Sequence, residues 1–161
     1  MTERLRIRRI ISGGQTGADR GALDAAIELG IDHGGHCPAG RRAEDGRIPE
    51  HFRLIETESS DYAVRTERNV LDADGTLLVT RGTPTGGSAL TAALARKHDR
   101  ALLHLDLARE SDPVETVREW LATRAIECLN VAGPRESGCP GIAQDVRALI
   151  VAALDRDQRV D

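Results

Sequence analysis

The sequence predicts an α/β fold, in which a doubly wound, mainly parallel sheet carries helices on both faces and forms three layers. Short apolar runs are followed repeatedly by a glycine-rich turn and an amphipathic helical pattern, an order that is typical of βαβ units. Hydrophobic residues make up 40 % of the chain but aromatic residues only 2 %, so the core must consist of Leu, Ile, Val and Ala, which suits parallel strands covered by helices. The length of 161 residues indicates one domain, residues 1–161.

The chain is expected to begin with a strand and a helix. Residues 9–12 are an apolar run that ends at a glycine pair, which favours a strand. A helix is predicted from residue 16 or 17 to residue 29, because its apolar residues recur at helical spacing. Thr16 and Asp19 resemble a capping box at its start, and Gly30 is well placed to end it.

The next part of the chain is expected to contain two short strands and a helix. Residues 33–37 and 52–55 are short extended runs on either side of a polar stretch, residues 38–49, that is rich in Arg, Gly and Asp. A helical pattern then covers residues 62–73.

Strands and helices alternate in the second half. Residues 76–80 are the clearest buried strand, because they are apolar or β-branched and turn residues flank them. The later elements are predicted at residues 88–97 (helix), 101–105 (strand), 113–123 (helix), 128–132 (strand) and 141–154 (helix). The helix that begins at residue 113 has a proline in its first turn, where proline is favoured, and the last helix has one apolar side.

Composition disfavours several classes of protein. No run of about 18 apolar residues is present, so no membrane span is expected. The net charge of −4 and the single Trp, Tyr and Phe argue against a nucleic-acid partner, which would need a basic surface and several stacking rings. The N-terminal residues do not resemble a signal peptide, and the three cysteines are widely spaced, so we expect a cytoplasmic protein with free thiols.

A metal site is not expected either. His33, His36 and Cys37 lie close together in the sequence, but their spacing is not that of a zinc site. We interpret these residues as ordinary residues at the end of a strand.

The first of three glycine-rich turns follows the first strand, from Ser12 to Arg20. Glycines allow the backbone to approach a ligand closely, and amides at the start of a helix favour a phosphate or another oxyanion. Asp19 is an acceptor that either orients Arg20 or holds a polar ring edge. The alternative is a tight turn before a capped helix. The residues expected to contact a ligand are Gly13, Gly14, Gln15, Thr16, Gly17, Asp19 and Arg20.

The other two turns, residues 81–88 and 133–141, follow later strands. Each turn alone could equally be a solvated loop, but parallel strands end at one edge of a sheet, which is where such folds bind ligands. In the third turn Arg135 offers a forked cation and Ser137 a hydroxyl. The residues expected at the site are Thr83, Thr85, Gly86, Gly87, Ser88, Gly133, Arg135, Glu136 and Ser137.

Two further segments are candidates for closing this site. Arg41 and Arg42 lie beside paired acids, and either line the site or belong to a self-paired surface loop. Arg65, Asn69 and Asp72 are spaced so that they share one face of a helix, which lines a cleft or faces water.

No catalytic residue is assigned from the sequence. There is no GxSxG elbow and no nucleophile–base pair that spacing supports. Asp19 and Glu136 are the acids near the turns that would be available for acid–base work if the protein hydrolyses its ligand.

Several long motifs carry a family resemblance. They are GGQTGADR (13–20), CPAGRRAEDG (37–46), RTERNV (65–70), DGT (74–76), LNVAGPRES (129–137) and PGI (140–142). In this order, over about residues 9 to 150, they resemble the putative molybdenum carrier family. These proteins are related to molybdenum cofactor carriers, within a Rossmann-like group that includes the lysine-decarboxylase-like nucleotide phosphoribohydrolases.

The resemblance implies a Rossmann-like fold, homo-oligomers, and a non-enzymatic carrier of molybdenum cofactor or of molybdate or tungstate, with molybdoenzymes as recipients. On this model the first two turns hold the anionic groups, and the third turn with Arg41 and Arg42 lines the cleft. Cys37 or Cys139 could touch the metal, but the cofactor already brings its own dithiolene sulfurs.

Two other functions stay open. The phosphoribohydrolases have a PGGxGT-type turn followed by a glutamate, whereas no glutamate closely follows residues 84–91 (PTGGSALT) here. This difference disfavours a nucleotide phosphoribohydrolase-type N-glycosidase, although a nucleotide-binding protein remains an alternative. The third option is a sensor of a nucleotide-like ligand.

Overall fold

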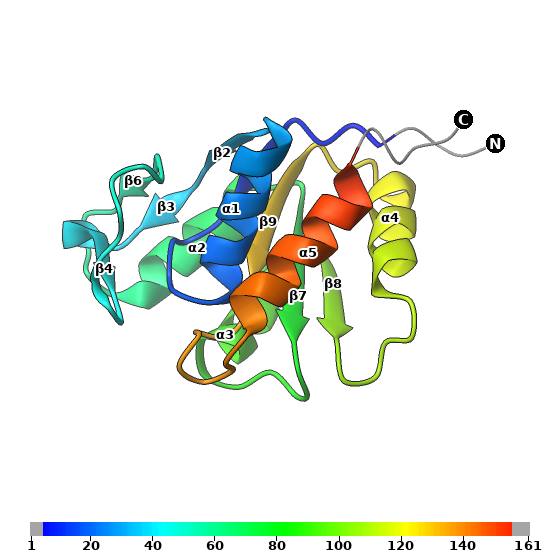
Figure 1. Ribbon diagram of the computed structural model, residues 1–161. Coiled ribbons are helices and arrows are strands. Elements are labelled where there is room, and N and C mark those ends of the chain that lie inside the picture. Colours follow the sequence, from blue (N-terminus) through cyan, green and yellow to red (C-terminus); the bar gives the residue numbers. More distant parts are fainter. Residues whose placement is uncertain (1–4, 156–161) are drawn as a thin grey trace.

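A five-stranded parallel sheet forms the middle layer of the protein (Figure 1). The computed structural model describes residues 5–155. The strand order is β2-β1-β9-β7-β8, and every neighbouring pair is parallel. These strands are β1 (Arg9–Ile11), β2 (Asp32–Gly34), β7 (Gly75–Thr80), β8 (Ala101–Asp106) and β9 (Cys128–Ala132).

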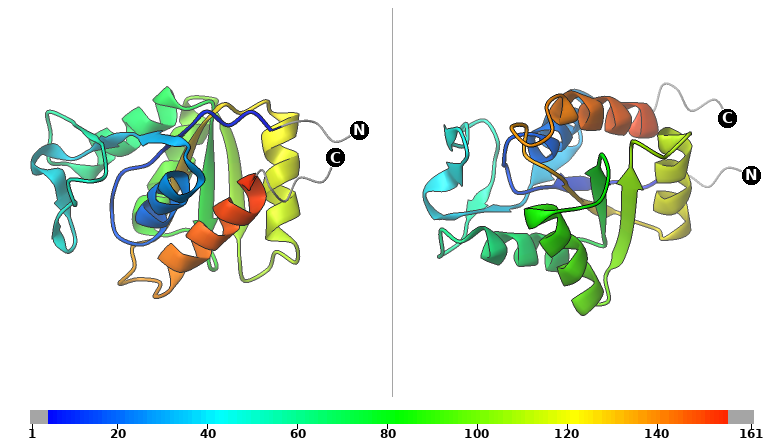
Figure 2. Two further views of the ribbon diagram at one scale, coloured as in Figure 1. Left: turned by 45° about the horizontal axis from the view of Figure 1, so that its top comes forward. Right: turned by 90° about the horizontal axis from the view of Figure 1, so that it is seen from below.

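Helices cover both faces of this sheet, which confirms the predicted three-layer, Rossmann-like arrangement (Figures 1 and 2). On one face, α1 and α5 pack against each other and α4 packs beside α5, whereas α2 and α3 pack together on the opposite face. The helices are α1 (Ala18–Leu29), α2 (Tyr62–Asp72), α3 (Gly86–Lys97), α4 (Pro113–Thr123) and α5 (Ile142–Leu154).

The main core lies between the sheet and the α1–α5 pair. Strand β7 is buried along its whole length, and Leu77 and Val79 belong to this core. The two helices approach so closely that a Cβ on Gly21 would lie 2.2 Å from the carbonyl oxygen of Ala143. Only glycine fits at that point, and the close contact fixes how the turns at the helix starts sit relative to one another.

The direction in which successive strands are added to the sheet reverses at β9. From β1 the chain passes through α1 to β2, whereas from β7 it passes through α3 to β8 on the other side of the sheet. Strand β9 lies between β1 and β7. In open parallel sheets such a reversal leaves a crevice at the carboxyl ends of the strands.

A small lobe formed by residues 36–56 differs from the prediction in detail. The strand expected at 33–37 is divided into β2 and β3 (His36–Cys37) at Gly35, which has a φ of 121° and whose Cβ would lie 2.3 Å from the Ser12 oxygen. The strand expected at 52–55 is β6 (Ile55–Glu56), which pairs with β3. Between them lie the short helix η1 (Ala39–Arg41) and the hairpin of β4 (Arg42–Ala43) and β5 (Gly46–Arg47).

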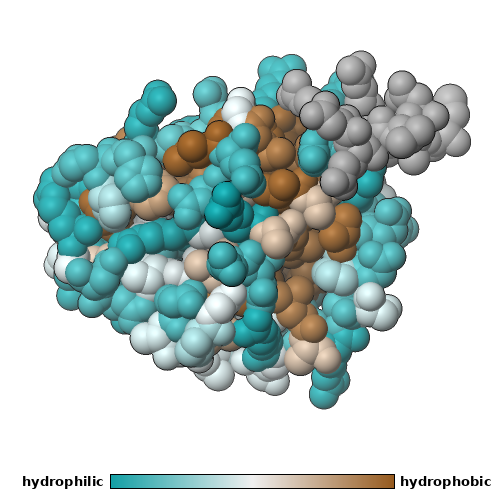
Figure 3. All heavy atoms as spheres, viewed as in Figure 1, coloured by the Kyte–Doolittle hydropathy of each residue, from teal (hydrophilic) through white to brown (hydrophobic). Residues whose placement is uncertain are grey.

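Hydrophilic side chains cover this lobe on the face shown in Figure 3, whereas apolar side chains gather around α5. No helix within residues 5–155 is both long enough and apolar enough to cross a membrane.

Arg41 holds the lobe together from inside. Its side chain is buried, and its guanidinium donates hydrogen bonds to the carbonyl oxygens of Ile48, Pro49 and Phe52 at 3.1, 2.8 and 2.8 Å. A small apolar cluster surrounds this loop and includes Cys37.

We therefore expect Arg41→Met to lower the free energy of unfolding by about 2–4 kcal/mol, because three buried carbonyls lose a charged donor. Urea denaturation measures this change. The matched variant Arg42→Met alters an exposed neighbour and should change stability by less than about 1 kcal/mol. Equal effects of the two substitutions would show that Arg41 does not anchor the lobe.

Candidate functional site

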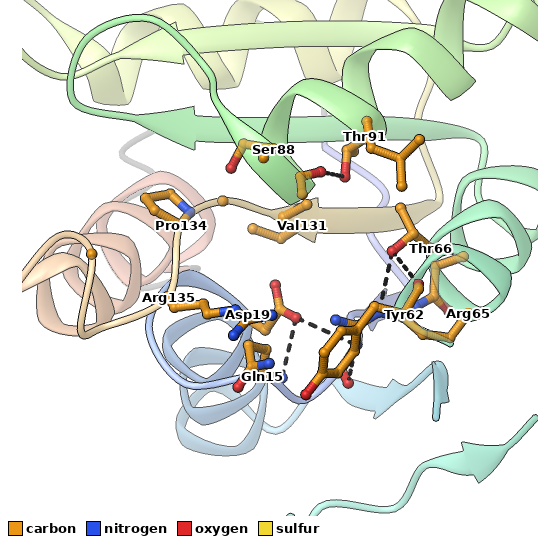
Figure 4. A pocket seen from close by; sticks show the side chains of 18 of the residues that line it. Gln15, Asp19, Tyr62, Arg65, Thr66, Ser88, Thr91, Val131, Pro134 and Arg135 are labelled. Carbon is orange, nitrogen blue, oxygen red and sulfur yellow. Dashed lines mark hydrogen bonds and ion pairs between the residues drawn. The ribbon is translucent and has the colours of Figure 1, made fainter. Parts of the chain in front are cut away.

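A cavity of about 380 Å³ lies at the carboxyl ends of β1, β9 and β7 (Figure 4). This volume is in the range of pockets that hold small organic molecules. All three glycine-rich turns reach the cavity, as the sequence predicts. The predicted site residues that line it are Gly13, Gln15, Asp19, Thr85, Gly86, Gly87, Ser88, Gly133, Arg135 and Ser137.

The other predicted site residues do not line this cavity. They are Gly14, Thr16, Gly17, Arg20, Arg41, Arg42, Thr83 and Glu136. Gly14 has a φ of 79°, and a Cβ there would meet Leu54 and Ile48 at 2.6 and 2.9 Å, so it faces the small apolar cluster instead. A side chain at Gly14 would therefore point into that apolar cluster and not into the cavity.

Several of these residues join the turns to one another. Thr16 donates to Glu44 and accepts a hydrogen bond from the Glu136 amide. The Glu136 carboxylate accepts from the amides of Gly141 and Ala143, at the start of α5. These hydrogen bonds hold the rim of the cavity in shape.

The first turn does not offer the row of free amides that its glycines predict. The Gln15 amide donates to the Asp19 carboxylate at 3.2 Å, and the Thr16 amide donates to Gln15 Oε1 at 3.1 Å. Arg20 is occupied as well, because it donates to the Gly14 oxygen and pairs with Asp45. At this point of the turn the side chains of Gln15 and Asp19 line the cavity, while the backbone amides of Gln15 and Thr16 are occupied.

The start of α3 has the opposite character. Thr85, at the N-cap position, makes no side-chain capping bond, and no acid lies in the first turn of the helix. The first amides of an α-helix have no partner within the helix, and the helix dipole makes this end positive. A Cβ on Gly87 would meet nothing within 4 Å, so the cavity is open at this point. These features make the start of α3 the part of the cavity wall that is chemically best suited to an anion.

Asp19 is a buried carboxylate at the edge of this cavity. Desolvation by burial raises its pKa above the ordinary value, although Arg65, the Gln15 amide, Ser12 and Arg20 act in the opposite direction. Arg65 Nη1 lies 3.9 Å from Asp19 Oδ2 and donates a 2.6 Å bond to the Gly13 oxygen. A buried acid with a raised pKa in a cavity is typical of a ligand-contacting group.

Three arginines lie close to the ring of Tyr62, which lines the cavity; two of them, Arg65 and Arg135, are labelled in Figure 4. The guanidinium carbons of Arg42, Arg135 and Arg65 lie 4.4, 4.9 and 5.3 Å from the ring centroid. Arg42 therefore approaches the cavity without lining it. This cluster places positive charge around Tyr62, on the same side of the cavity as Asp19.

Helix α2 carries the polar stripe that the sequence predicts either to line a cleft or to face water. Arg65 and Asn69 line the cavity, so the cleft interpretation is correct for these two residues. Asp72 instead contacts His36 at 2.6 Å. The spacing of Arg65 and Asn69 was the signal for this wall. Pro134 and Gly138 belong to the predicted third turn, and the lining residues outside the predicted segments are Tyr62, Thr66, Leu90, Thr91, Asn130, Val131 and Ala132.

Within residues 5–155, no group of three His, Cys, Asp or Glu residues could hold a metal ion. Cys37 lies in the small apolar cluster, and Cys139 approaches Arg81 at 3.8 Å. Neither thiol lines the cavity.

Comparisons with known proteins agree with this architecture. The model of the circularly permutated YpsA SLOG family matches residues 10–154. The chain is also similar to a crystal structure described as a putative molybdenum carrier protein from Syntrophus aciditrophicus SB. The two share 48 % sequence identity over 94 % of this chain and 98 % of that one, with a TM-score of 0.93.

A second structure, of (E)-4-hydroxy-3-methyl-but-2-enyl diphosphate reductase, shares 11 % identity over 89 % of this chain and 59 % of that one, with a TM-score of 0.39. A likeness at that level carries no argument. A search of the curated proteins found no match.

The raised pKa of Asp19 predicts how stability depends on pH. A raised carboxyl pKa favours the folded state below the pKa of the unfolded chain, about 3.9, and this contribution is lost as the pH rises through the folded-state pKa. At neutral pH the ionised carboxylate therefore opposes folding.

Asp19→Asn, which mimics the neutral acid, should raise the melting temperature at pH 7 to 8, and the gain should shrink toward pH 4. Thermal unfolding across this range measures it. Asp24→Asn, an exposed position on the same helix, is the control and should show no such trend. If Asp19→Asn instead lowered the melting temperature at neutral pH, the ionised carboxylate would stabilise the fold and not oppose it.

Proposed function

The chain belongs to the circularly permutated YpsA SLOG family, and on this premise we propose that it is a non-enzymatic carrier of a phosphorylated ligand of the molybdenum cofactor type. The single observation that carries the proposal is the uncapped start of α3, which opens into a cavity of organic-ligand size. The ligand's phosphate would bind there, at the amides that begin the helix. The relative described as a putative molybdenum carrier protein supports the choice of ligand.

The size and chemistry of the cavity favour the cofactor over a bare oxyanion. A tetrahedral oxyanion such as molybdate or tungstate would occupy only part of about 380 Å³. The lining residues include no thiol and no imidazole. Molybdenum would therefore be held through the cofactor's own dithiolene sulfurs, and the protein would bind the organic part and its phosphate.

The hydroxyl groups of the cavity are consistent with a carrier. The Thr66 and Thr91 hydroxyls donate to the backbone carbonyl oxygens of Tyr62 and Gly87, and the Ser137 hydroxyl donates to the Glu44 carboxylate. A hydroxyl nucleophile needs a neighbouring base that accepts its proton, and for Ser137 the only such partner is a surface carboxylate. A carrier requires binding and release, for which no nucleophile is needed.

The wider carrier role is part of the same proposal. The protein would act as one domain in the cytoplasm, assemble into homo-oligomers and deliver its cargo to molybdoenzymes. Sedimentation of the purified protein, alone and with a molybdenum-free recipient enzyme, tests the assembly and the partner.

Gly87→Val tests the anion-binding end. The valine side chain would enter the cavity, where a Cβ meets nothing within 4 Å, and would keep a phosphate from the α3 amides. We expect wild-type protein from a host that makes the molybdenum cofactor to retain molybdenum and phosphorus in equal amounts, and Gly87→Val to lose at least about 90 % of both. Elemental mass spectrometry measures both contents.

Ala89→Val is the matched control, because it makes a similar change at an exposed position of the same helix outside the cavity. It should retain the wild-type content. If Gly87→Val retained as much molybdenum as the wild-type protein, the ligand would not bind at the start of α3. If the protein contained molybdenum but no phosphorus, the cargo would be a bare oxyanion.

One observation favours a second candidate, a nucleotide N-glycosidase. Asp19 is a buried acid with a raised pKa in the cavity, a property that suits a general acid. It would protonate the leaving base while water forms the new bond to the sugar carbon. Against this, helix α3 contains no glutamate or aspartate. Chromatographic detection of free base after incubation with nucleoside monophosphates would establish this activity in place of the carrier role.

A further inference from the structure

One buried donor in the cavity has no partner. The Gln15 side chain is 5 % exposed and lines the cavity, and its Nε2 makes no hydrogen bond. Its Oε1 accepts from the amides of Thr16 and Glu44, at 3.1 and 2.8 Å, so the orientation of this side-chain amide is fixed and Nε2 is the free end. Buried donors are nearly always paired, and an unpaired one next to a cavity points to a missing acceptor.

The Asp19 carboxylate lies beside this donor, on the side of the cavity opposite Ser88 (Figure 4). It is held in place through Oδ2, which accepts from the Gln15 backbone amide at 3.2 Å. Arg65 is only a distant partner at 3.9 Å, because its Nη1 donates to Gly13 and its Nε to Thr66. An ionised carboxylate has about four acceptor positions, so Asp19 retains capacity for further donors.

The charges divide the cavity into two ends. Asp19 would repel a phosphate, whereas the helix dipole at the start of α3 would attract one. A ligand that enters with its phosphate toward α3 therefore brings an uncharged, hydrogen-bonding part to Asp19 and Gln15.

We propose that Asp19 and Gln15 recognise the edge of a 2-amino-4-oxopyrimidine ring, the unit that pterins and guanine share. This inference rests on the proposed phosphate site at α3. The exocyclic amino group and the ring N–H donate to the two oxygens of Asp19, and Gln15 Nε2 donates to the ring carbonyl. Each of the three groups on the ring edge then meets the complementary group on the protein, and the unpaired donor of Gln15 gains its acceptor.

Nucleoside monophosphates test this edge, because they differ in the ring but share the phosphate. In calorimetric titrations the wild-type protein should bind GMP at least about tenfold more tightly than IMP, which lacks the amino group, since a lost hydrogen bond to a charged acceptor has an effect of this size. AMP, which reverses the donor and the acceptor of the ring edge, should bind more weakly still.

Asp19→Asn should remove the preference for GMP and favour XMP, because the asparagine amide can donate to the 2-oxo group of xanthine. Gln15→Glu should weaken GMP binding by placing a carboxylate against the ring carbonyl. Asp24→Asn should behave as wild type. Unfolding curves for each variant confirm that the protein titrated is folded.

A further titration distinguishes the two sources of this ring. Tighter binding of 6-hydroxymethylpterin phosphate than of GMP identifies a pterin, and the reverse order identifies a guanine nucleotide; both orders support the inference. Equal binding of GMP, IMP and XMP, or an unchanged GMP-to-IMP ratio in Asp19→Asn, overturns the ring-edge inference but leaves the phosphate site intact if Gly87→Val abolishes binding. Failure of every phosphorylated ligand to bind overturns both.

Discussion

The site depends on one topological constraint, the parallel alignment of β1, β9 and β7 at the point where the chain changes direction. Because these strands are parallel neighbours, the turns that follow them emerge at the same edge of the sheet. The close contact of α1 with α5 at Gly21 then fixes the first and third turns against each other. Three turns, of which the first and the third lie more than a hundred residues apart in the sequence, are thus brought to one cavity.

Local hydrogen bonding makes the two rims of this cavity, the first turn and the start of α3, different in the groups that they offer to a ligand. In the first turn the backbone amides of Gln15 and Thr16 are occupied by the side chains of Asp19 and Gln15. At the start of α3 no side chain caps the helix, and although the Ser88 amide donates to the Thr85 oxygen at 3.0 Å, no side chain covers the amides of Gly86 and Gly87. Both rims are rich in glycine and polar residues, and their difference lies in which of their own side chains can fold back onto the backbone.

The sequence predicted most of the fold, because strands such as β7 and helices such as α4 carry clear local patterns of burial. The convergence of the three turns also followed from the sequence, since it is a consequence of parallel strands. The sequence could not show that Gly14 faces an apolar cluster or that Arg41 is buried beneath a loop, because both depend on contacts with Ile48 and its neighbours, distant from the turn. The polar stripe of α2 was visible as spacing, but only the packing of α2 against the sheet decides that Arg65 and Asn69 face the cavity.

Gln15 connects the proposed ring-binding end of the cavity to the β4–β5 hairpin at its entrance. Its Oε1 accepts from the Glu44 amide, and the Glu44 carboxylate in turn accepts from Thr16 and Ser137, so the β4–β5 hairpin is tied to the first and third turns. The same hairpin carries Arg42, whose guanidinium lies over the ring of Tyr62. The side chain that offers an unpaired donor to the cavity is therefore also the one that positions the hairpin beside it. A substitution that removes Gln15 Oε1 would disturb the entrance as well as the ring-binding end, whereas Gln15→Glu keeps an oxygen for Thr16 and Glu44 and replaces the unpaired donor by an acceptor. Because the new carboxylate is buried beside Asp19, the unfolding curve of this variant has to accompany its binding curve.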